Sequence, residues 1–384
     1  MRLSRNVVVL GIVSLVADIS SDMVMPLLPA FVVALGGGAA FIGVIEGAAE
    51  GISALLKYAS GRWADRVRRL LPLAVAGYVL AAVARPLLAV ARAPWQVLAV
   101  RSVDRVGKGI RTTPRDKLLA ASAPREQLAE AFAFHRGMDH AGAAIGPLIA
   151  AGLLLIWPGE VRRVFLLASI PGAIAVLALL AVREQPREPA APGPRGASGG
   201  AVPVRLLTAI GLFTLGNSTD ALLLLRAGTL GIPLARLPLL WALLHLVRAV
   251  FSWPLGRAAD LLGRTRTLIA GWLWYAACYA GFALARAPWQ MWALFAGYGL
   301  VAALTEGTER ALIADAAPPA ARGRALGLYN LVTGLGLLAA SVLAGEVWEQ
   351  VSPAAALTMG AVLAFAASAT LAAGPRAGGQ APAV

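Results

Sequence analysis

The chain has 384 residues, of which 59% are hydrophobic and 14% are charged, and its formal net charge is +14. A water-soluble domain normally carries about 25% charged residues, so this composition excludes a soluble globular protein and indicates a polytopic membrane protein. The single cysteine excludes an intramolecular disulfide, and the three histidines form no spaced metal-binding set. Because the arginines are concentrated in short loops between apolar runs, we interpret the positive charge as a determinant of membrane orientation and not as a nucleic-acid surface.

Apolar stretches of about 20 residues, the length that crosses a bilayer, recur along the whole chain. The first follows Arg2 and Arg5 and is too long for a signal-peptide core of roughly 7–15 residues, so we expect it to be retained as a span. The period-two alternation of a membrane β-barrel is absent. The sequence therefore predicts an all-α polytopic membrane protein with about twelve transmembrane helices, at residues 6–34, 40–60, 72–91, 94–121, 130–156, 164–182, 205–230, 237–255, 266–285, 288–315, 324–345 and 353–373.

Two short motifs occur once in each half of the chain, which indicates an internal duplication. Gly61-Arg-Trp-Ala-Asp65 recurs as Gly256-Arg-Ala-Ala-Asp260, and Ala93-Pro-Trp-Gln96 recurs as Ala287-Pro-Trp-Gln290. Both repeats are shifted by about 195 residues, and the segment between the halves is rich in Pro, Gly, Ala and charge. We therefore predict two pseudo-symmetric halves, with an amino-terminal six-helix bundle at 1–183, a cytoplasmic linker at 184–203, a carboxy-terminal six-helix bundle at 204–375 and a disordered tail at 376–384.

The fourth predicted span carries a line of cations. Arg105, Lys108 and Arg115 follow Arg101 by four, seven and fourteen residues, so all four share one helix face. A cation facing lipid at a helix centre costs roughly 2.5 kcal/mol or more, so we expect this face to lie against water, counter-ions or an anionic ligand inside a bundle. A lone histidine such as His245 is also typical of a packing group. The side chains that we expect to line a substrate cavity are Arg101, Arg105, Lys108, Arg136, His135, His245 and Arg248.

Carboxylates also occur within the apolar runs, and they are candidates for proton coupling. Burial disfavours the charged form of a carboxylate and a neighbouring arginine favours it, so such a group can take up and release a proton. Asp22 is our first choice, because Ser-Ser-Asp22 in the first span matches Ser-Thr-Asp220 in the seventh. The alternative is that these acids only neutralise the cations of the fourth span. The candidates are Asp22, Asp18, Glu46, Glu50, Asp139 and Asp220.

Three motifs carry a resemblance to a known family. The loop after the second span has a glycine, an aspartate four residues later and then basic residues, and a weaker copy follows the eighth span. The other two are an arginine in the fourth span and a glycine-proline pattern in the fifth. The matching residues are Gly61, Asp65 and Arg66, then Gly256, Asp260 and Arg264, then Arg101, and finally Gly142, Gly146 and Pro147. On these residues the chain resembles the major facilitator superfamily of secondary transporters, over essentially its full length, and we interpret it as a bacterial member.

The resemblance implies a role for two of these motifs. In the loops, a carboxylate would pair with an arginine or a helix amino terminus of a neighbouring span in one conformation and release it in the other. The alternative is a solvated turn that only fixes the topology. In the fifth span, small residues permit close helix contact, and the family associates this pattern with exporters. The predicted conformational latch consists of Gly61, Asp65, Arg66, Asp260 and Arg264, and the predicted helix-packing motif of Gly142, Gly146 and Pro147.

These observations predict a secondary active transporter that moves a small solute by alternating access, and proton-coupled efflux by antiport is the expected mode. The alternatives are proton-coupled uptake by symport of a small anionic or zwitterionic metabolite, and a non-transporting membrane receptor or scaffold. An intramembrane enzyme is not expected, because the chain has no His-Glu-x-x-His and no glycine-rich phosphate loop.

The predicted partners follow from this function. We expect a small-molecule substrate and the lipid bilayer, no nucleic acid, no metal and no cofactor other than the proton gradient, and a monomeric protein. The arginine-rich loops place both termini in the cytoplasm, in a multi-pass protein of the bacterial plasma or inner membrane.

Overall fold

A computed structural model describes residues 3–124, 127–184, 203–317 and 322–373 of the chain. These residues are almost entirely helical, and the predicted all-α fold is confirmed. Each predicted span corresponds to a helix, or to two helical segments in sequence, with bounds close to those expected. The helices are α1 (Arg5–Val24), α2 (Leu28–Ala34), α3 (Ala39–Arg66), α4 (Leu71–Leu87), α5 (Pro94–Ala121), α6 (Leu128–Ile156), α7 (Val161–Leu167), α8 (Ser169–Leu179), α9 (Val204–Gly216), α10 (Asp220–Thr229), α11 (Leu237–Leu262), α12 (Arg264–Leu284), α13 (Pro288–Asp315), α14 (Arg322–Gln350) and α15 (Pro353–Ala372).

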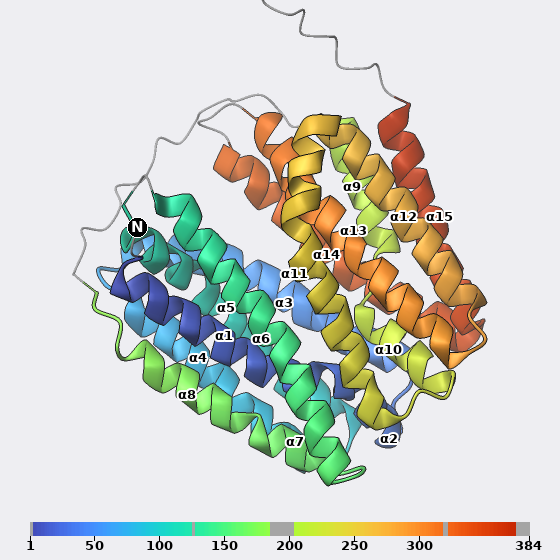
Figure 1. The fold of residues 1–384 in the computed structure, drawn as a ribbon, viewed down its shortest axis with the longest axis horizontal. Helices are drawn as coiled ribbons and strands as arrows, with labels where there is room; N and C mark the ends of the chain where they lie inside the picture. The colour runs from blue at the N-terminus through green and yellow to red at the C-terminus, as the bar shows by residue number, and fades with distance from the viewer. Residues whose placement is uncertain (1–2, 125–126, 185–202, 318–321, 374–384) are drawn as a thin grey trace, which may run out of the picture.

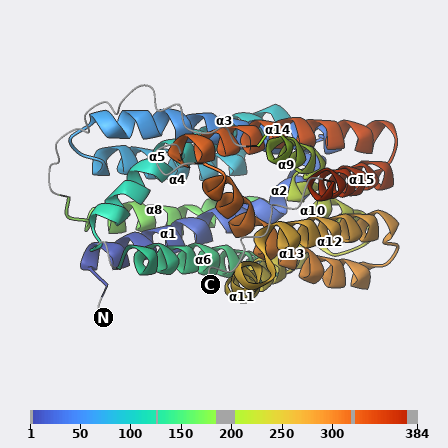
Figure 2. The same cartoon turned by 90° about the horizontal axis from the view of Figure 1, so that it is seen from above.

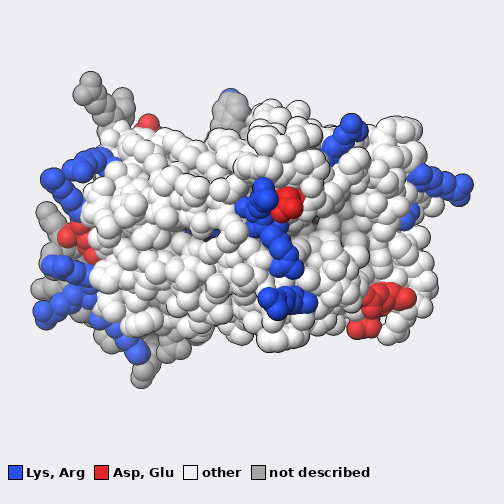
Figure 3. Space-filling view, turned by 90° about the horizontal axis from the view of Figure 1, so that it is seen from below, with Lys and Arg blue, Asp and Glu red and all other residues white. Residues whose placement is uncertain are grey.

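Ten of the described helical segments are long and apolar enough to cross a membrane. The helices α5 and α13 are equally long, at 28 residues each, but fall outside this group because they carry more polar and charged residues. Figure 3 shows wide uncharged areas on one face of the molecule, between separate groups of charged atoms. Such a surface is expected where helices face lipid, so the charged residues of α5 must lie inside.

The helices form two bundles, α1–α8 and α9–α15, which meet near α2 and α10 and separate toward the end that carries the amino terminus (Figure 1). Two seams join the bundles, α3 against α14 on one side and α6 against α11 on the other (Figure 2). Just before α1, Ser4 Oγ donates to the carbonyl oxygen of Ser122 at 2.6 Å and so joins the start of α1 to the end of α5. Residues 185–202 and 374–384, which contain most of the predicted linker and the predicted tail, lie outside the described residues, so those predictions stay open.

The repeated Ala-Pro-Trp-Gln motif is a helix start in both bundles. Pro94 and Pro288 are the first residues of α5 and α13, where a proline loses no intrahelical hydrogen bond. The side-chain oxygen of Gln96 accepts from the N–H of Arg92 at 2.6 Å, and that of Gln290 accepts from the N–H of Ala287 at 2.9 Å. The duplicated motif therefore forms the same helix N-terminal structure in both bundles, at the end of the molecule opposite the start of α1.

The first and seventh spans are interrupted. Pro26 and Pro29 divide the first into α1, a short 3-10 turn (Met25–Leu27) and α2, because proline cannot donate within a helix. The seventh is broken at 217–219, and Thr219 caps α10 by accepting from the N–H of Ala221 at 3.2 Å. Irregular backbone at this depth is tolerated in a membrane protein only where it is buried or lines a cavity. Both interruptions lie beside the cavity described below.

Close backbone contact closes the molecule at the end opposite the amino terminus. A Cβ at Gly43 would collide with the carbonyl oxygen of Ser341, and one at Gly345 would lie 2.6 Å from the carbonyl oxygen of Ala39, so α3 and α14 touch backbone to backbone. Beyond this contact, Glu349 Oε1 accepts from the N–H of Ala40 at 3.1 Å, in the first turn of α3. These contacts join the bundles at the end opposite the amino terminus.

Candidate functional site

A cavity of about 590 Å³ lies between the bundles. Its wall includes both breaks described above, with Met25 from the first span and 217–219 from the seventh. All six carboxylates predicted for proton coupling line it, together with five of the seven predicted cavity residues. The predicted residues on the wall are Asp18, Asp22, Glu46, Glu50, Asp139, Asp220, Arg105, Lys108, Arg136, His245 and Arg248.

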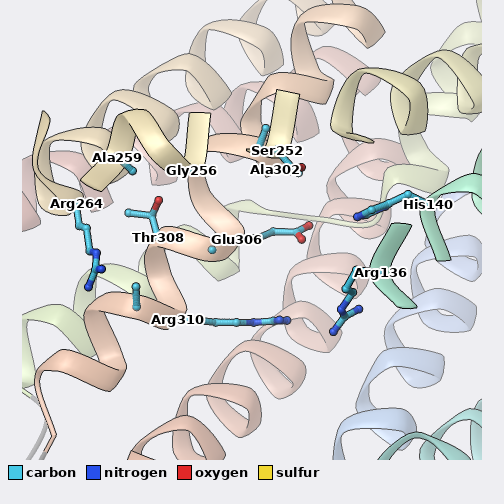
Figure 4. Close-up of a pocket in the computed structure, with 13 residues that line it drawn as sticks. Arg136, His140, Ser252, Gly256, Ala259, Arg264, Ala302, Glu306, Thr308 and Arg310 are labelled. Atoms are coloured by element: carbon cyan, nitrogen blue, oxygen red, sulfur yellow. The ribbon is translucent and has the colours of Figure 1, made fainter. Parts of the chain in front are cut away.

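A second pocket of about 450 Å³ continues the cavity toward the end where the bundles separate. It shares Arg136, His140, Glu306 and Arg310 with the central cavity and extends to Arg264, at the start of α12. In Figure 4, Arg136 and His140 from the first bundle face Glu306 and Arg310 from the second across the same opening. The cavity therefore opens at the end of the molecule where α1 begins and is closed at the other end (Figure 1).

Arg101 lies behind the cavity wall and not on it. Its guanidinium is 4% exposed and pairs with both carboxylate oxygens of Glu46, at 2.9 and 3.0 Å. It also contacts Asp104 Oδ2 at 3.4 Å, and Asp104 in turn pairs with Arg85 at 3.0 Å. Paired buried charges of this kind hold α3, α4 and α5 in register. A direct contact of Arg101 with a solute stays a prediction that this geometry does not favour.

From the next turn of α5 onward, the cations on α3 and α5 outnumber the carboxylates that lie near them. Arg105 is 5% exposed, and its Nη1 lies 3.8 Å from Oε1 of Glu50, whose side chain is 34% exposed. Glu50 interacts electrostatically with Arg101, which is already paired with Glu46, and with Arg105, Lys108 and Lys57. Neither lysine has a carboxylate oxygen within 4.0 Å among the residues that the structure describes. This part of the wall has a clear excess of positive charge.

Asp22 is bonded across the interface between the bundles. Its Oδ1 accepts a hydrogen bond of 2.9 Å from the indole Nε1 of Trp241 in α11. The corresponding acid of the second bundle, Asp220, accepts instead from Tyr298 at 2.7 Å and pairs with Arg248 at 3.2 Å, all within its own bundle. The sequence repeat therefore places two aspartates at equivalent positions with different partners, and Asp22 has no cation within ion-pair distance among the described residues.

A third acid, Asp139, joins the helices α1, α5 and α6. It accepts from Ser14 Oγ, and Ser14 also accepts from Nη1 of Arg115 at 3.2 Å. His135 Nδ1 and Arg136 Nη1 each lie 3.6 Å from Asp139 Oδ2. His135 is 2% exposed and does not reach the cavity, so its predicted place on the wall is not seen in this conformation.

The glycine-proline pattern of α6 sets the position of α1. A Cβ at Gly142 would collide with the carbonyl oxygen of Leu15, and one at Gly146 would lie 2.6 Å from that of Ile19. Only glycine permits this backbone approach. The contact covers the part of α1 that carries Asp18 and Asp22. The packing of α6 on α1 therefore determines how far along the cavity both carboxylates lie.

The predicted latch is described only in part. The side chains of Asp65 and Asp260 lie outside the described residues, so their pairing stays a prediction. Gly61, near the end of α3, accepts from Lys117 Nζ of α5 at 3.3 Å through its carbonyl oxygen, and Arg66 is exposed in the last turn of that helix. Arg264 forms an ion pair with Asp315 and thereby joins the start of α12 to the end of α13.

One residue of the cavity wall and two buried charged residues elsewhere in the bundles were not among the residues predicted from the sequence. Trp241 lies one turn before His245, a spacing that places both rings on one face of α11, 5.1 Å apart. Glu309 is 6% exposed and accepts from Trp272 at 3.0 Å and Tyr329 at 2.8 Å. Arg85 stands in an apolar run next to Pro86, where a basic residue is itself a signal of a buried partner. Among the described residues, no three His, Cys, Asp or Glu side chains gather into a metal-binding group.

Comparison with known proteins agrees with this architecture. The family model of the Major Facilitator Superfamily matches residues 10–247 and 206–382. An uncharacterised MFS-type transporter of Methanocaldococcus jannaschii is 32% identical over 381 residues, which cover 95% of this chain and 93% of the relative. Two solved structures share the fold at low identity. A POT family transporter in complex with 5-aminolevulinic acid has a TM-score of 0.79 at 12% identity and 95% coverage of both chains, and the nucleoside transporter NupG has a TM-score of 0.77 at 15% identity, covering 95% of this chain and 100% of that one.

Proposed function

Because this chain belongs to the major facilitator superfamily and is a multi-pass membrane transporter and not an enzyme, we propose that it moves a small anionic or zwitterionic solute by proton-coupled alternating access. The observation that carries this proposal is the excess of cations on the cavity wall. Lys57, Arg105 and Lys108 all interact electrostatically with Glu50, and Arg105 lies within ion-pair distance of it. Arg105 is buried and the two lysines are half-buried. A charge withdrawn from water without a full partner is costly, and an anionic solute would supply the missing partner.

Asp22 is the proposed proton-coupling residue. It lines the same cavity as the cations and interacts electrostatically with Lys108 and Arg105, yet it forms no ion pair with them. Protonation of Asp22 would remove one negative charge and so leave the cavity more favourable to an anion. By linkage, the anion would in turn favour protonation. Proton and anion would therefore bind together, which supports transport of both in the same direction, as in symport.

Export by antiport is the second candidate, and the packing of α6 on α1 favours it. Gly142 and Gly146 approach the backbone of α1 beside Asp18 and Asp22. This glycine pattern is the one that the sequence resemblance associates with exporters. In antiport, binding of the proton and binding of the solute would exclude one another, so the transporter would carry one of them in each direction. The same carboxylates serve both modes, so the two candidates differ in the sign of the coupling between proton and solute.

We further propose how the protein is oriented in the membrane and that it is monomeric. An even number of spans returns the chain to the end where it begins, and the arginine-rich loops favour the cytoplasm for that end. The cavity would then be open to the cytoplasm in this conformation, in a bacterial plasma or inner membrane. We propose a monomer that uses the proton gradient and no other cofactor.

The test is a measurement of proton movement in liposomes that contain the purified chain and a trapped pH-sensitive dye. A panel of organic acids, amino acids and phosphate esters is added outside, one at a time. Symport is expected to acidify the lumen, whereas antiport would make it alkaline. The Glu160→Gln variant, which removes an exposed acid outside the cavity, is expected to behave as the wild type. No proton movement with any solute, together with no exchange of labelled solute, would rule out the proposed function.

A further inference from the structure

We infer that the solute carries a doubly charged oxyanion, such as a phosphate monoester or a dicarboxylate, and that Lys57, Arg105 and Lys108 bind it. This inference rests on the proposed function and narrows it, because a monocarboxylate or a simple zwitterion would not satisfy these three cations. The shared chemistry is a group with two negative charges spread over several oxygens.

The three cations form one cluster on two adjacent helices. Arg105 and Lys108 lie three residues apart on α5 and therefore share a face, and Lys57 reaches the same space from α3. Glu50 interacts with all three and is the only carboxylate of the described residues within ion-pair distance of any of them, at 3.8 Å from Arg105. Three cations against one carboxylate leave a net charge of about two, which a dianion would neutralise.

The neighbouring charges do not change this balance, because most of them are paired and the opposite charges of Glu306 and Arg310 on the same wall offset one another. Four other arginines around the cavity pair with acids, in the pairs Arg101–Glu46, Arg115–Asp116, Arg136–Asp139 and Arg248–Asp220. Arg111 stacks on the ring of Tyr78 at 4.1 Å, and Asp18 on the same wall interacts with Arg111 more than with Lys108. Asp22 is the remaining acid that the first bundle contributes to the described cavity wall. In the proposed mechanism it is protonated when the solute is bound, so it leaves the excess of two charges in place.

An unpartnered donor points to the same ligand. The Nε of Arg105 is buried and has no hydrogen-bond partner, although Arg105 belongs to the cavity wall. A guanidinium offers several donors in a fixed plane, and a lysine offers a mobile point charge, so together they match the several oxygens of a phosphate or a dicarboxylate. A buried donor left empty is costly, which is a reason for it to bind an oxyanion.

The second bundle can complete the site. Lys57 interacts electrostatically with Arg310 of α13 and with Arg136 of α6. In Figure 4 the side chains of Arg310 and Arg136 approach one another across the opening, from opposite bundles. Like charges across an opening repel, so an anion between them would lower the cost of bringing the bundles together at this end. A dianion on the cluster would therefore favour closure as well as binding.

The experiment measures binding by calorimetry to the full chain in lipid nanodiscs, at constant ionic strength. The probes are glycerol phosphate and inorganic phosphate, succinate as a dicarboxylate, acetate as a monoanion and glycine as a zwitterion. We expect at least one dianionic probe to bind about tenfold more tightly than acetate and glycine, since each added charge-assisted contact contributes roughly this factor. Lys57→Gln and Lys108→Gln should each lower that affinity about tenfold.

The matched control is Arg163→Gln, which also removes one positive charge but at an exposed pair with Glu160, outside the cavity. Its affinity should equal that of the wild type. Lys57→Arg and Lys108→Arg keep the charge and should retain binding, so they show whether a loss in the Gln variants arises from misfolding. Equal binding of acetate or glycine and the dianions, or unchanged affinity in both Gln variants, overturns the inference and leaves the proposed function standing. No binding and no transport of any anion overturns both.

Discussion

The indole Nε1 of Trp241 donates a hydrogen bond of 2.9 Å to Oδ1 of Asp22, and this bond crosses from the second bundle to the first. Asp22 therefore lies both at the cavity and at the interface that would rearrange in the proposed alternating access. A hydrogen bond to a charged acceptor is stronger than one to a neutral acceptor, so the contact weakens when the carboxylate takes up a proton. Protonation of Asp22 would thus be communicated directly to the second bundle.

The first prediction concerns coupling at Asp22. Asp22→Asn keeps an acceptor for Trp241 but cannot take up or release a proton. We expect the variant to reach the membrane, to lose solute accumulation driven by a pH gradient to the level of empty liposomes, and to retain exchange of labelled against unlabelled solute, because exchange needs no proton release. The two fluxes are measured in the same proteoliposome preparation.

Glu160→Gln serves as the control, since it neutralises an exposed acid outside the cavity. Gradient-driven accumulation at the wild-type level in Asp22→Asn would exclude Asp22 as the coupling residue. Loss of exchange as well would instead assign Asp22 to solute binding or to folding.

The second prediction concerns the closed end. Glu349 accepts from the N–H of Ala40 in the first turn of α3, where a carboxylate also interacts favourably with the helix dipole. Glu349→Gln should weaken this end by roughly 0.3–1 kcal/mol and so raise the population in which it is open by up to about fivefold. The population is measured as the distance between spin labels at Val33→Cys and Val351→Cys, two exposed positions on opposite bundles, in a Cys278→Ser background.

Glu346→Gln is the matched control, because Glu346 lies one turn earlier on α14 and bonds to Gln350 within its own helix. Its distance distribution should be that of the parent. A Glu349→Gln distribution identical to the parent would show that the closed end is held by the α3–α14 backbone contact alone.

The spans could be predicted to within about seven residues at each end because their signal is local. Apolar length fixes each span, and a proline or a loop fixes its start, as Pro94 and Pro288 do for α5 and α13. The break of the seventh span was missed, although the polar run from Asn217 to Thr219 carries a signal for it. A hydropathy window averages such a short run with its apolar neighbours.

The partners of the charged residues could not be predicted, because they depend on how helices rotate against one another. Arg101 and Arg105 share a face by spacing, and the spacing alone does not distinguish them. Arg101 is turned away from the cavity because its guanidinium binds both carboxylate oxygens of Glu46, whereas Arg105 lies on the wall. The bond between Trp241 and Asp22 joins residues of different bundles, so no spacing within one helix indicates it.

The third prediction concerns the packing of α6 on α1. Gly146→Leu would force a side chain against the backbone of α1 at Ile19 and Met23, beside Asp22. Overpacking of this kind costs roughly 1–3 kcal/mol, so the thermal midpoint of the detergent-purified protein should fall, and transport should be lost with it. Gly152→Leu is the control on the same helix, because a Cβ at Gly152 meets no atom within 4 Å. Equal thermal midpoints for the two variants would show that α1 and α6 can separate where Gly146 contacts α1.

The fourth prediction separates a structural role of Arg101 from a role in solute binding. Removing one partner of the buried Arg101–Glu46 pair leaves an uncompensated charge, at a cost of about 3–5 kcal/mol. Arg101→Met and Glu46→Leu should therefore each lower the yield of folded protein sharply. The double variant should recover most of the stability, because replacing both charges by apolar groups is often neutral. The coupling energy is obtained from the four thermal midpoints as a double-mutant cycle.

Solute affinity of the folded double variant then decides the role of Arg101. Its guanidinium lies behind the wall and its donors are occupied by Glu46 and Asp104, so we expect affinity close to that of the wild type. The matched comparison is Lys108→Gln, which removes one charge that does face the cavity and should weaken binding. If the double variant is folded but no longer binds the solute, then Arg101 or Glu46 reaches the solute in another conformation, as the line of cations on the fourth span predicts.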